Sequence, residues 1–224
     1  MSKGDEVGMR TIDITTWKRR AHYEYFRHME YPHFGLVAEV EVGALVEWCR
    51  REGRSFYHAM VHTASAAANS VEEFRYRIRA DEVVLHEVIH PSFTLLRDDE
   101  LFDFCPLSFQ PDLLPFLEEA RSRAAAQVQG PAFGREPEGD DRLFITCIPW
   151  VHFTGISHPI AIANCDSVPR LSWGRYERRG AGIFLPFGVQ AHHAFVDGLH
   201  VGRFFQALER GLAAFGSSAA KGVL

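Results

Sequence analysis

The segment 183–215 constrains the fold of this chain more than any other. It runs from an apolar stretch, through the sequence QAHHAFVDG (190–198), into a stretch whose apolar residues recur at helical spacing. This pattern predicts a strand over 183–191, a turn, and a helix from 199 to about 215. A histidine therefore lies at the end of a strand, with the carboxylate of Asp197 close by. Since free histidine titrates nearest to neutral pH, the position suits proton abstraction, and the segment indicates an enzyme.

Composition places the chain among globular proteins. Of its 224 residues, 46% are hydrophobic and 24% are charged, which is sufficient for a large core in a single domain over residues 1–224. The net charge of -5 indicates neither a nucleic-acid surface nor an anionic-membrane binder. No apolar stretch approaches transmembrane length, and the first residues lack the apolar core of a signal peptide. We therefore expect a cytoplasmic protein.

The cysteines and histidines do not form a metal-binding pattern. The four cysteines are scattered without CxxC spacing, and no HExxH motif occurs among the 12 histidines. The adjacent His192 and His193 would point to opposite faces of a strand, which makes them poor joint ligands for one ion. We expect no metal site.

Periodicity and turn signals predict helices and strands that do not alternate regularly. The predicted helices are 17–29 (capped by Thr15 or Thr16), 44–51, 56–68 and 111–129, besides 199–215. The predicted strands are 34–42, 83–90, 92–96 (separated from 83–90 by Pro91), 143–148, 160–163 and 170–176, besides 183–191. The segment 130–141, rich in Gly, Pro and acidic residues, is expected to be a mobile loop. Such an order favours an α/β fold of the α+β kind, a two-layer sandwich in which helices pack on a mixed, largely antiparallel sheet.

The sequence HHAFVDGLHVGR (192–203) resembles the active-site signature HHxxxDG of the chloramphenicol acetyltransferases, which other CoA-dependent acyltransferases share. Other segments resemble the family in the family's own order. They are DITTWKRRAHY (13–23), similar to the amino-terminal W-x-R-x-x-H-[FY] segment, SFYH (55–58), HPSFT (90–94), IPWVHFT (148–154) and AN (163–164). The resemblance covers roughly residues 10–215, and the chain is identified as a member of this family.

This resemblance implies an acetyl-CoA-dependent O-acetyltransferase that acetylates chloramphenicol and so confers antibiotic resistance. Acetyl-CoA would be a co-substrate rather than a permanently bound cofactor. The resemblance also implies a homotrimer with active sites between subunits. Two alternatives stay open. One is an acyltransferase for a different hydroxyl or amine acceptor, and the other is a member that binds CoA with little turnover.

The resemblance gives three residues catalytic roles. His193 would be the general base that takes the proton of the acceptor hydroxyl, with its other ring nitrogen held by its own backbone carbonyl. Asp197 would pair with Arg19 and support this geometry. Judged by local pattern alone, His193 could be structural, Asp197 could simply cap the following helix, and Arg19 lies in a basic run typical of a solvated helix face.

Other residues are implied to bind the two substrates. For the CoA moiety they are Arg175, Tyr176, Arg54 and Thr154, and for the acceptor they are Phe26, Phe102, Phe133 and Ser172, the last orienting a water. Arginine suits phosphate, whereas Tyr176 and the phenylalanines, judged singly, are more typical of a core.

The chain also departs from the family pattern. Gly155 stands where we place, after Pro-Trp, a family serine whose hydroxyl stabilises the oxyanion, and loss of one such donor typically costs about 100- to 1000-fold in rate. Thr154, Ser157 or a water could substitute, the favoured acceptor could differ, or the glycine could meet a backbone requirement. Phe26 replaces a pocket tyrosine, and Glu30 adds a carboxylate nearby. These departures leave the identity of the acceptor open.

Overall fold

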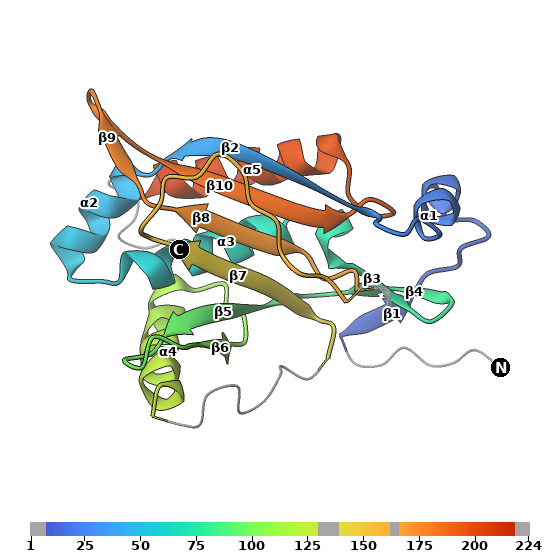
Figure 1. Ribbon diagram of the computed structural model, residues 1–224, viewed down its shortest axis with the longest axis horizontal. Helices are drawn as coiled ribbons and strands as arrows, with labels where there is room; N and C mark the ends of the chain where they lie inside the picture. Colours follow the sequence, from blue (N-terminus) through green and yellow to red (C-terminus); the bar gives the residue numbers. More distant parts are fainter. Residues whose placement is uncertain (1–7, 130–138, 162–165, 218–224) are drawn as a thin grey trace.

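The computed structural model describes residues 8–129, 139–161 and 166–217. The main sheet has seven strands, six of them in the order β2-β10-β8-β7-β5-β6, with β9 paired to β10 (Figure 1). These strands are β2 (His33–Glu41), β5 (His90–Leu96), β6 (Phe102–Pro106), β7 (Arg142–Ile148), β8 (Arg170–Gly174), β9 (Glu177–Arg179) and β10 (Gly182–His192). The pairs β5–β7 and β7–β8 are parallel, and the other four pairs are antiparallel. The prediction of a mixed, largely antiparallel sheet is confirmed.

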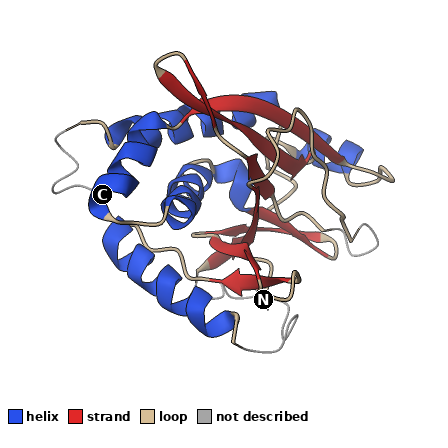
Figure 2. Ribbon diagram, turned by 60° about the vertical axis from the view of Figure 1, so that its left-hand side comes forward, coloured by secondary structure: helices blue, strands red, loops and turns tan. Residues whose placement is uncertain are grey.

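Helices gather on one side of this sheet (Figure 2). They are α2 (Gly43–Glu52), α3 (Phe56–Asn69), α4 (Leu113–Gln127) and α5 (Gly198–Ala214). Buried alanines along α3 allow α2, α4 and α5 to pack closely around it. On the sheet side the core continues through aromatic rings, with Phe187 of β10 lying 5.7 Å from Phe204 of α5. The two-layer prediction is therefore confirmed.

The ends of the molecule carry smaller elements. α1 (Arg20–Phe26) lies beside the end of β10, and a second sheet has the strand order β1-β4-β3 (Figure 1). Its strands are β1 (Met9–Thr11), β3 (Tyr76–Arg79) and β4 (Glu82–His86), and a 3₁₀ helix, η1 (Glu72–Arg75), leads into β3. None of the helices in the described ranges is both long and apolar enough to cross a lipid bilayer.

Three predicted elements need correction. The helix predicted over 17–29 is only α1, because Thr15 and Thr16 hydrogen-bond to Asp13 and form a turn instead of a cap. Pro91 does not separate two strands, since β5 passes through it in parallel register with Leu143. Residues 160 and 161 are not in a strand, and the rest of the strand predicted over 160–163 lies outside the described residues. So does most of the predicted loop, 130–138.

Residues 149–161, which follow β7, cross the face of the sheet opposite the helices (Figure 1). They approach β8 closely at Gly174, where an added Cβ would lie 2.5 Å from the carbonyl oxygen of Val151. That carbonyl accepts a hydrogen bond from the backbone N–H of Arg175 at 2.8 Å. The glycine thus allows residues 149–161 to form one wall over the sheet.

Candidate active site

His193 stands in the turn between β10 and α5. Its backbone N–H donates to the carbonyl of Pro32 at 2.7 Å. The centroid of its ring lies 4.2 Å from that of Phe26 and 4.6 Å from that of Phe34. Nδ1 lies 3.0 Å from the carbonyl oxygen of Val196. Because a carbonyl only accepts, Nδ1 carries the proton and Nε2 keeps a free lone pair. The ring is therefore held in the tautomer that a general base at Nε2 requires.

The partner of Nδ1 differs from the prediction. We expected the backbone carbonyl of His193 itself, whereas the structure places the carbonyl of Val196 there. The turn after β10 folds back, with the Val196 N–H donating to the carbonyl of His192. This brings the Val196 carbonyl within hydrogen-bond distance of Nδ1 of His193. The consequence for the tautomer is the same.

Asp197 makes both interactions considered for it in the sequence, the ion pair with Arg19 and the cap of the following helix, which are compatible. Its Oδ2 lies 3.1 Å from Nη1 of the buried Arg19, and its Oδ1 accepts the N–H of Leu199 at 3.0 Å as the N-cap of α5. Burial by itself raises the pKa of Asp197, but the hydrogen bond from Arg19, the neighbouring His200 and the Leu199 N–H together lower it below its ordinary value. The carboxylate therefore remains ionised and ties the turn to Arg19.

His200, for which no function was predicted from the sequence, completes this cap. Its Nδ1 accepts the backbone N–H of Asp197 at 3.1 Å, and its Nε2 lies 3.2 Å from Oε1 of the buried Glu73. Burial lowers the pKa of His200, so the ring is neutral and its Nε2–H donates to the Glu73 carboxylate. The three-residue spacing from Asp197 to His200 is that of a capping box, which is the signal that could have found it.

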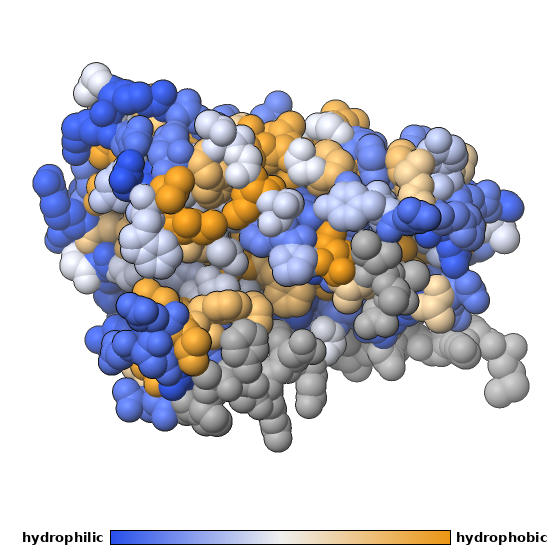
Figure 3. All heavy atoms as spheres, viewed as in Figure 1, coloured by the Kyte–Doolittle hydropathy of each residue, from blue (hydrophilic) through white to orange (hydrophobic). Residues whose placement is uncertain are grey.

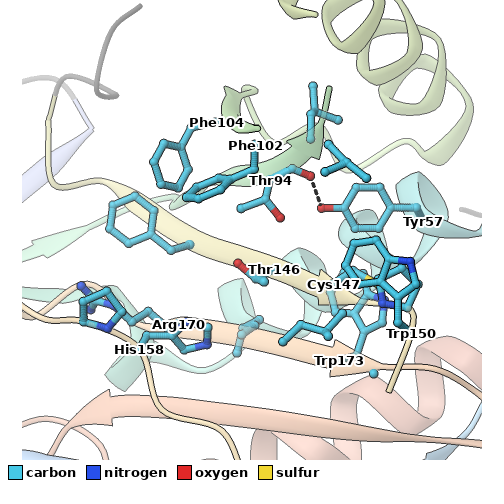
Figure 4. A pocket seen from close by; sticks show the side chains of 18 of the residues that line it. Tyr57, Thr94, Phe102, Phe104, Thr146, Cys147, Trp150, His158, Arg170 and Trp173 are labelled. Atoms are coloured by element: carbon cyan, nitrogen blue, oxygen red, sulfur yellow. Dashed lines mark hydrogen bonds between the residues drawn. The ribbon is translucent and has the colours of Figure 1, made fainter. Parts of the chain in front are cut away.

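A separate large cavity of about 1690 Å³ lies between β5, β6, β7 and β8 and the wall 149–161. Figure 4 shows Phe102 and Phe104 on one side of it, Trp150 and Trp173 at one end, and His158 with Arg170 at the other. Exposed apolar side chains contribute to its lining, and Figure 3 shows apolar residues gathered over the middle of this face of the molecule. The cavity suits an aromatic ligand.

The predicted binding residues divide between this cavity and other places. Phe102, Arg175 and Tyr176 line the cavity, whereas Phe26 packs on His193, and Arg54, Thr154 and Ser172 are outside the lining. Phe133 lies outside the described residues. Tyr176 and Phe102 are both 46% exposed, so neither is a core residue.

Ser172 is connected to the cavity by a hydrogen bond to His158. Its buried Oγ lies 2.9 Å from Nε2 of His158, which lines the cavity and whose backbone N–H donates to Oε1 of Gln190 at 2.8 Å. Burial, and secondly the charge of Arg170, lower the pKa of His158, so the imidazole is neutral. Arg170 pairs with Asp166 in the cavity wall. Of these polar groups only Ser172 was predicted from the sequence to belong to the site.

Two further hydroxyls of the cavity, those of Thr94 and Thr146, were not predicted from the sequence. Thr146 lies on β7, opposite Ser172 in the register of β8, and points into the cavity (Figure 4). Thr154, Gly155 and Ser157 are exposed residues of the 149–161 segment and do not line the cavity. A Cβ on Gly155 would meet nothing within 4 Å. The geometry therefore gives no support to Gly155 as the position of an oxyanion donor.

His193 is absent from the cavity lining. It directly follows β10, whose end lies beside α1 (Figure 1), whereas the cavity is lined by residues of β5, β6, β7 and β8. A single copy of the chain thus presents a base and a ligand cavity in two different places. Among the described residues, no cluster of His, Cys, Asp or Glu is placed to hold a metal ion.

The fold is that of the CoA-dependent acyltransferases. A probable dihydrolipoamide acetyltransferase from Listeria monocytogenes, 15% identical, superposes with a TM-score of 0.67 over 93% of this chain and 96% of that one. A solved chloramphenicol acetyltransferase, 25% identical, superposes with a TM-score of 0.80 over 91% of this chain and 99% of the other.

The sequence comparison is more specific. The profile of the chloramphenicol acetyltransferase family matches residues 7–209, and the chain belongs to this family of acyltransferase enzymes. It is 31% identical over 205 residues to a chloramphenicol acetyltransferase of Streptomyces acrimycini, covering 90% of this chain and 93% of the relative. It is 30% identical over 206 residues to chloramphenicol acetyltransferase 3 of Escherichia coli, covering 88% and 94%.

Proposed function

We propose that this protein transfers the acetyl group of acetyl-CoA to a hydroxyl of chloramphenicol and thereby inactivates the antibiotic. The observation that carries the proposal is His193, whose Nδ1–H is bonded to the Val196 carbonyl so that Nε2 is available as a base. Membership of the chloramphenicol acetyltransferase family supports the donor and the acceptor. A cytoplasmic location and a role in resistance belong to the same proposal.

The reaction needs no acylated residue. Nε2 of His193 takes the proton of the acceptor hydroxyl while the oxygen attacks the thioester carbonyl, which gives a tetrahedral oxyanion. Collapse of this intermediate breaks the carbon–sulfur bond, and the departing CoA thiolate takes the proton back from His193. The products are the acetyl ester and CoA. Arg19 and Asp197 act as positioning residues, because they hold the turn that carries His193.

Thr146 is our proposed donor to the oxyanion. Its hydroxyl stands in the middle of the cavity, between the aromatic side and the His158 end (Figure 4). A hydroxyl directed at the developing negative charge stabilises the transition state more than the ground state. Among the threonine and serine residues considered for this role, Thr154 and Ser157 lie outside the cavity lining.

A homotrimer would unite the base with the cavity. Because His193 does not line the cavity of its own chain, we propose that it enters the cavity of the next copy. Two observations support contacts between copies near His193. Among the described strands, β2 is paired with β10 alone, so its other edge has no partner within this part of the chain, and the side chains of Leu36 on β2, Tyr31 just before it and Tyr25 on α1 are exposed.

A different acceptor is the second candidate function. His158 and the Arg170–Asp166 ion pair make one end of the cavity polar, and this favours an alcohol that carries a second hydrogen-bonding group. The donor chemistry and the role of His193 would be unchanged.

One assay separates these functions. Purified protein is mixed with acetyl-CoA and an acceptor, and thiol release is followed with a chromogenic reagent. We expect release with chloramphenicol that His193→Ala reduces by at least about 1000-fold, since a positioned general base and its orientation of the acceptor are lost together. Release with other alcohols only would support the second candidate. CoA binding without release for any acceptor would contradict both.

A further inference from the structure

The two arginines implied to bind the CoA nucleotide already have carboxylate partners in the free chain. Nη2 of Arg175 lies 3.1 Å from Oε1 of Glu177, and Nη1 of Arg54 pairs with Oε1 of Glu118 on α4. Glu118 also accepts from Arg121 at 2.9 Å. In the free chain both guanidinium groups are therefore already paired with carboxylates.

Both arginines lie within two residues, along the chain, of the rings of one aromatic platform. The rings of Phe56 and Tyr176 are 5.6 Å apart and both line the cavity, with Arg54 two residues before the first and Arg175 directly before the second. Tyr176 is 46% exposed, as a ring that stacks on adenine must be. A nucleotide on this platform would bring its phosphates next to both ion pairs.

Phosphate and carboxylate then compete for the same donors. Phosphate and carboxylate can both accept two parallel hydrogen bonds from a guanidinium, but a phosphate monoester carries up to two charges against one on a carboxylate, so it attracts the arginine more strongly. The displaced carboxylates cannot move far, because Glu177 is two residues from Arg175 and the backbone of Glu118 is fixed in α4. They remain near the phosphates as like charges.

We propose that Glu177 and Glu118 are specificity-determining residues for the acyl donor, which lower the affinity for CoA by competing with its phosphates for Arg175 and Arg54. The inference rests on the proposed function. Its consequence is that the donor site binds CoA more weakly than its arginines alone would allow, which favours release of the CoA product.

The test is calorimetric binding of CoA, and of pantetheine as a donor fragment without phosphates, to the purified chain. Glu177→Gln and Glu118→Gln should each tighten CoA binding about two- to five-fold, the range typical of partly exposed charge pairs. The gain should shrink as salt is raised, and pantetheine binding should not change. Glu119→Gln is the matched control, since it removes the same charge one position along α4 beside Arg123.

The possible results distinguish a failure of the proposed competition from a failure of the proposed donor site. An equal gain in Glu119→Gln, an equal gain with pantetheine, or no gain in either variant would overturn the competition. Arg175→Ala and Arg54→Ala test the donor site itself, since both should weaken CoA binding. If they do and the glutamate variants have no effect, only the competition is wrong. If they leave CoA binding unchanged, the donor site lies elsewhere.

Discussion

The hydroxyl of Thr146, our proposed oxyanion donor, can be tested by single substitutions. Thr94 offers a second threonine hydroxyl in the same cavity, and this gives a matched pair of substitutions. Thr146→Val keeps the shape and removes the hydroxyl, so kcat should fall about 100-fold or more with little change in the KM for acetyl-CoA. Thr94→Val should lower kcat far less. Steady-state thiol release for the two variants measures both effects.

For a hydroxyl added at position 155, by contrast, we expect no effect on turnover. Because a side chain added there meets open space outside the cavity, Gly155→Ser should leave chloramphenicol turnover unchanged. A rise in turnover, or equal losses in both threonine variants, would show that the oxyanion is stabilised elsewhere than at Thr146.

Two buried histidines close to His193 make stability depend on pH. The rings of His33 and His192 are 4.9 Å apart, and burial lowers the pKa of His33 to about 4 and that of His192 to about 3. The unfolded chain takes up these protons near the ordinary value of 6.5, so below that pH it binds more protons than the folded chain. Folding stability from these groups is therefore complete above pH 6.5 and is lost as the pH falls toward 4.

This sign can be checked with His33→Gln. Urea unfolding at pH 7.5, 6 and 5 and at a fixed protein concentration should show a shallower loss of unfolding free energy than in the wild type. The difference should reach at most about 1.4 kcal/mol per pH unit, the slope of one proton. The exposed His28→Gln is the control and should leave the slope unchanged. An unchanged slope in His33→Gln would mean that this histidine titrates alike in both states.

At the scale of elements, the junction of β10 and α5 depends on Asp197 in two ways. Asp197→Ala removes the cap of α5 and leaves the buried Arg19 without its carboxylate, so it should destabilise the fold by about 2 kcal/mol or more. Asp197→Ser retains a capping oxygen and should recover about 1 kcal/mol of that loss. Urea unfolding of both variants tests this, and equal destabilisation would show that the cap contributes little.

The same junction shows why some elements could be predicted from the sequence. The strand–turn–helix over 183–215 has a long apolar run, a turn and a helical stripe, and the structure follows it within a few residues in β10 and α5. By contrast β3 has the sequence YRIR, whose apolar alternation covers only four residues and would place both arginines on a solvent face. Its Arg77 is fully buried because four backbone carbonyls accept its guanidinium hydrogens, and only tertiary structure can supply them.

Some residues of the candidate site could likewise be predicted from the sequence, and others could not. His193, Asp197 and Arg19 lie in motifs and could be predicted, and the structure brings the last two together. Thr146, His158 and the wall that closes the cavity come from β7 and an irregular segment with no recognisable spacing. Their meeting depends on the parallel register of β7 with β8, which a single sequence does not reveal.

At the scale of the whole molecule, the separation of His193 from the cavity predicts that neighbouring copies share each active site. His193→Ala lacks the base but has an intact cavity, and Thr146→Trp fills the cavity but retains the base. Each variant alone should be inactive. Co-expressed in equal amounts, they should form hybrid trimers in which one of the three sites combines an intact cavity with an intact histidine of the next subunit, which makes about one quarter of all sites in the mixture.

Thiol release by the hybrids therefore measures the architecture directly. Light scattering of each preparation should give the mass of three chains, and the co-expressed mixture should recover roughly a quarter of wild-type activity. Separately purified variants, mixed without unfolding, should stay inactive because their trimers do not exchange chains. If hybrids form and remain inactive, each chain holds its own complete site, and a movement within one copy must bring His193 to the cavity. The recovered fraction thus decides whether the catalytic unit is one chain or a pair of neighbours.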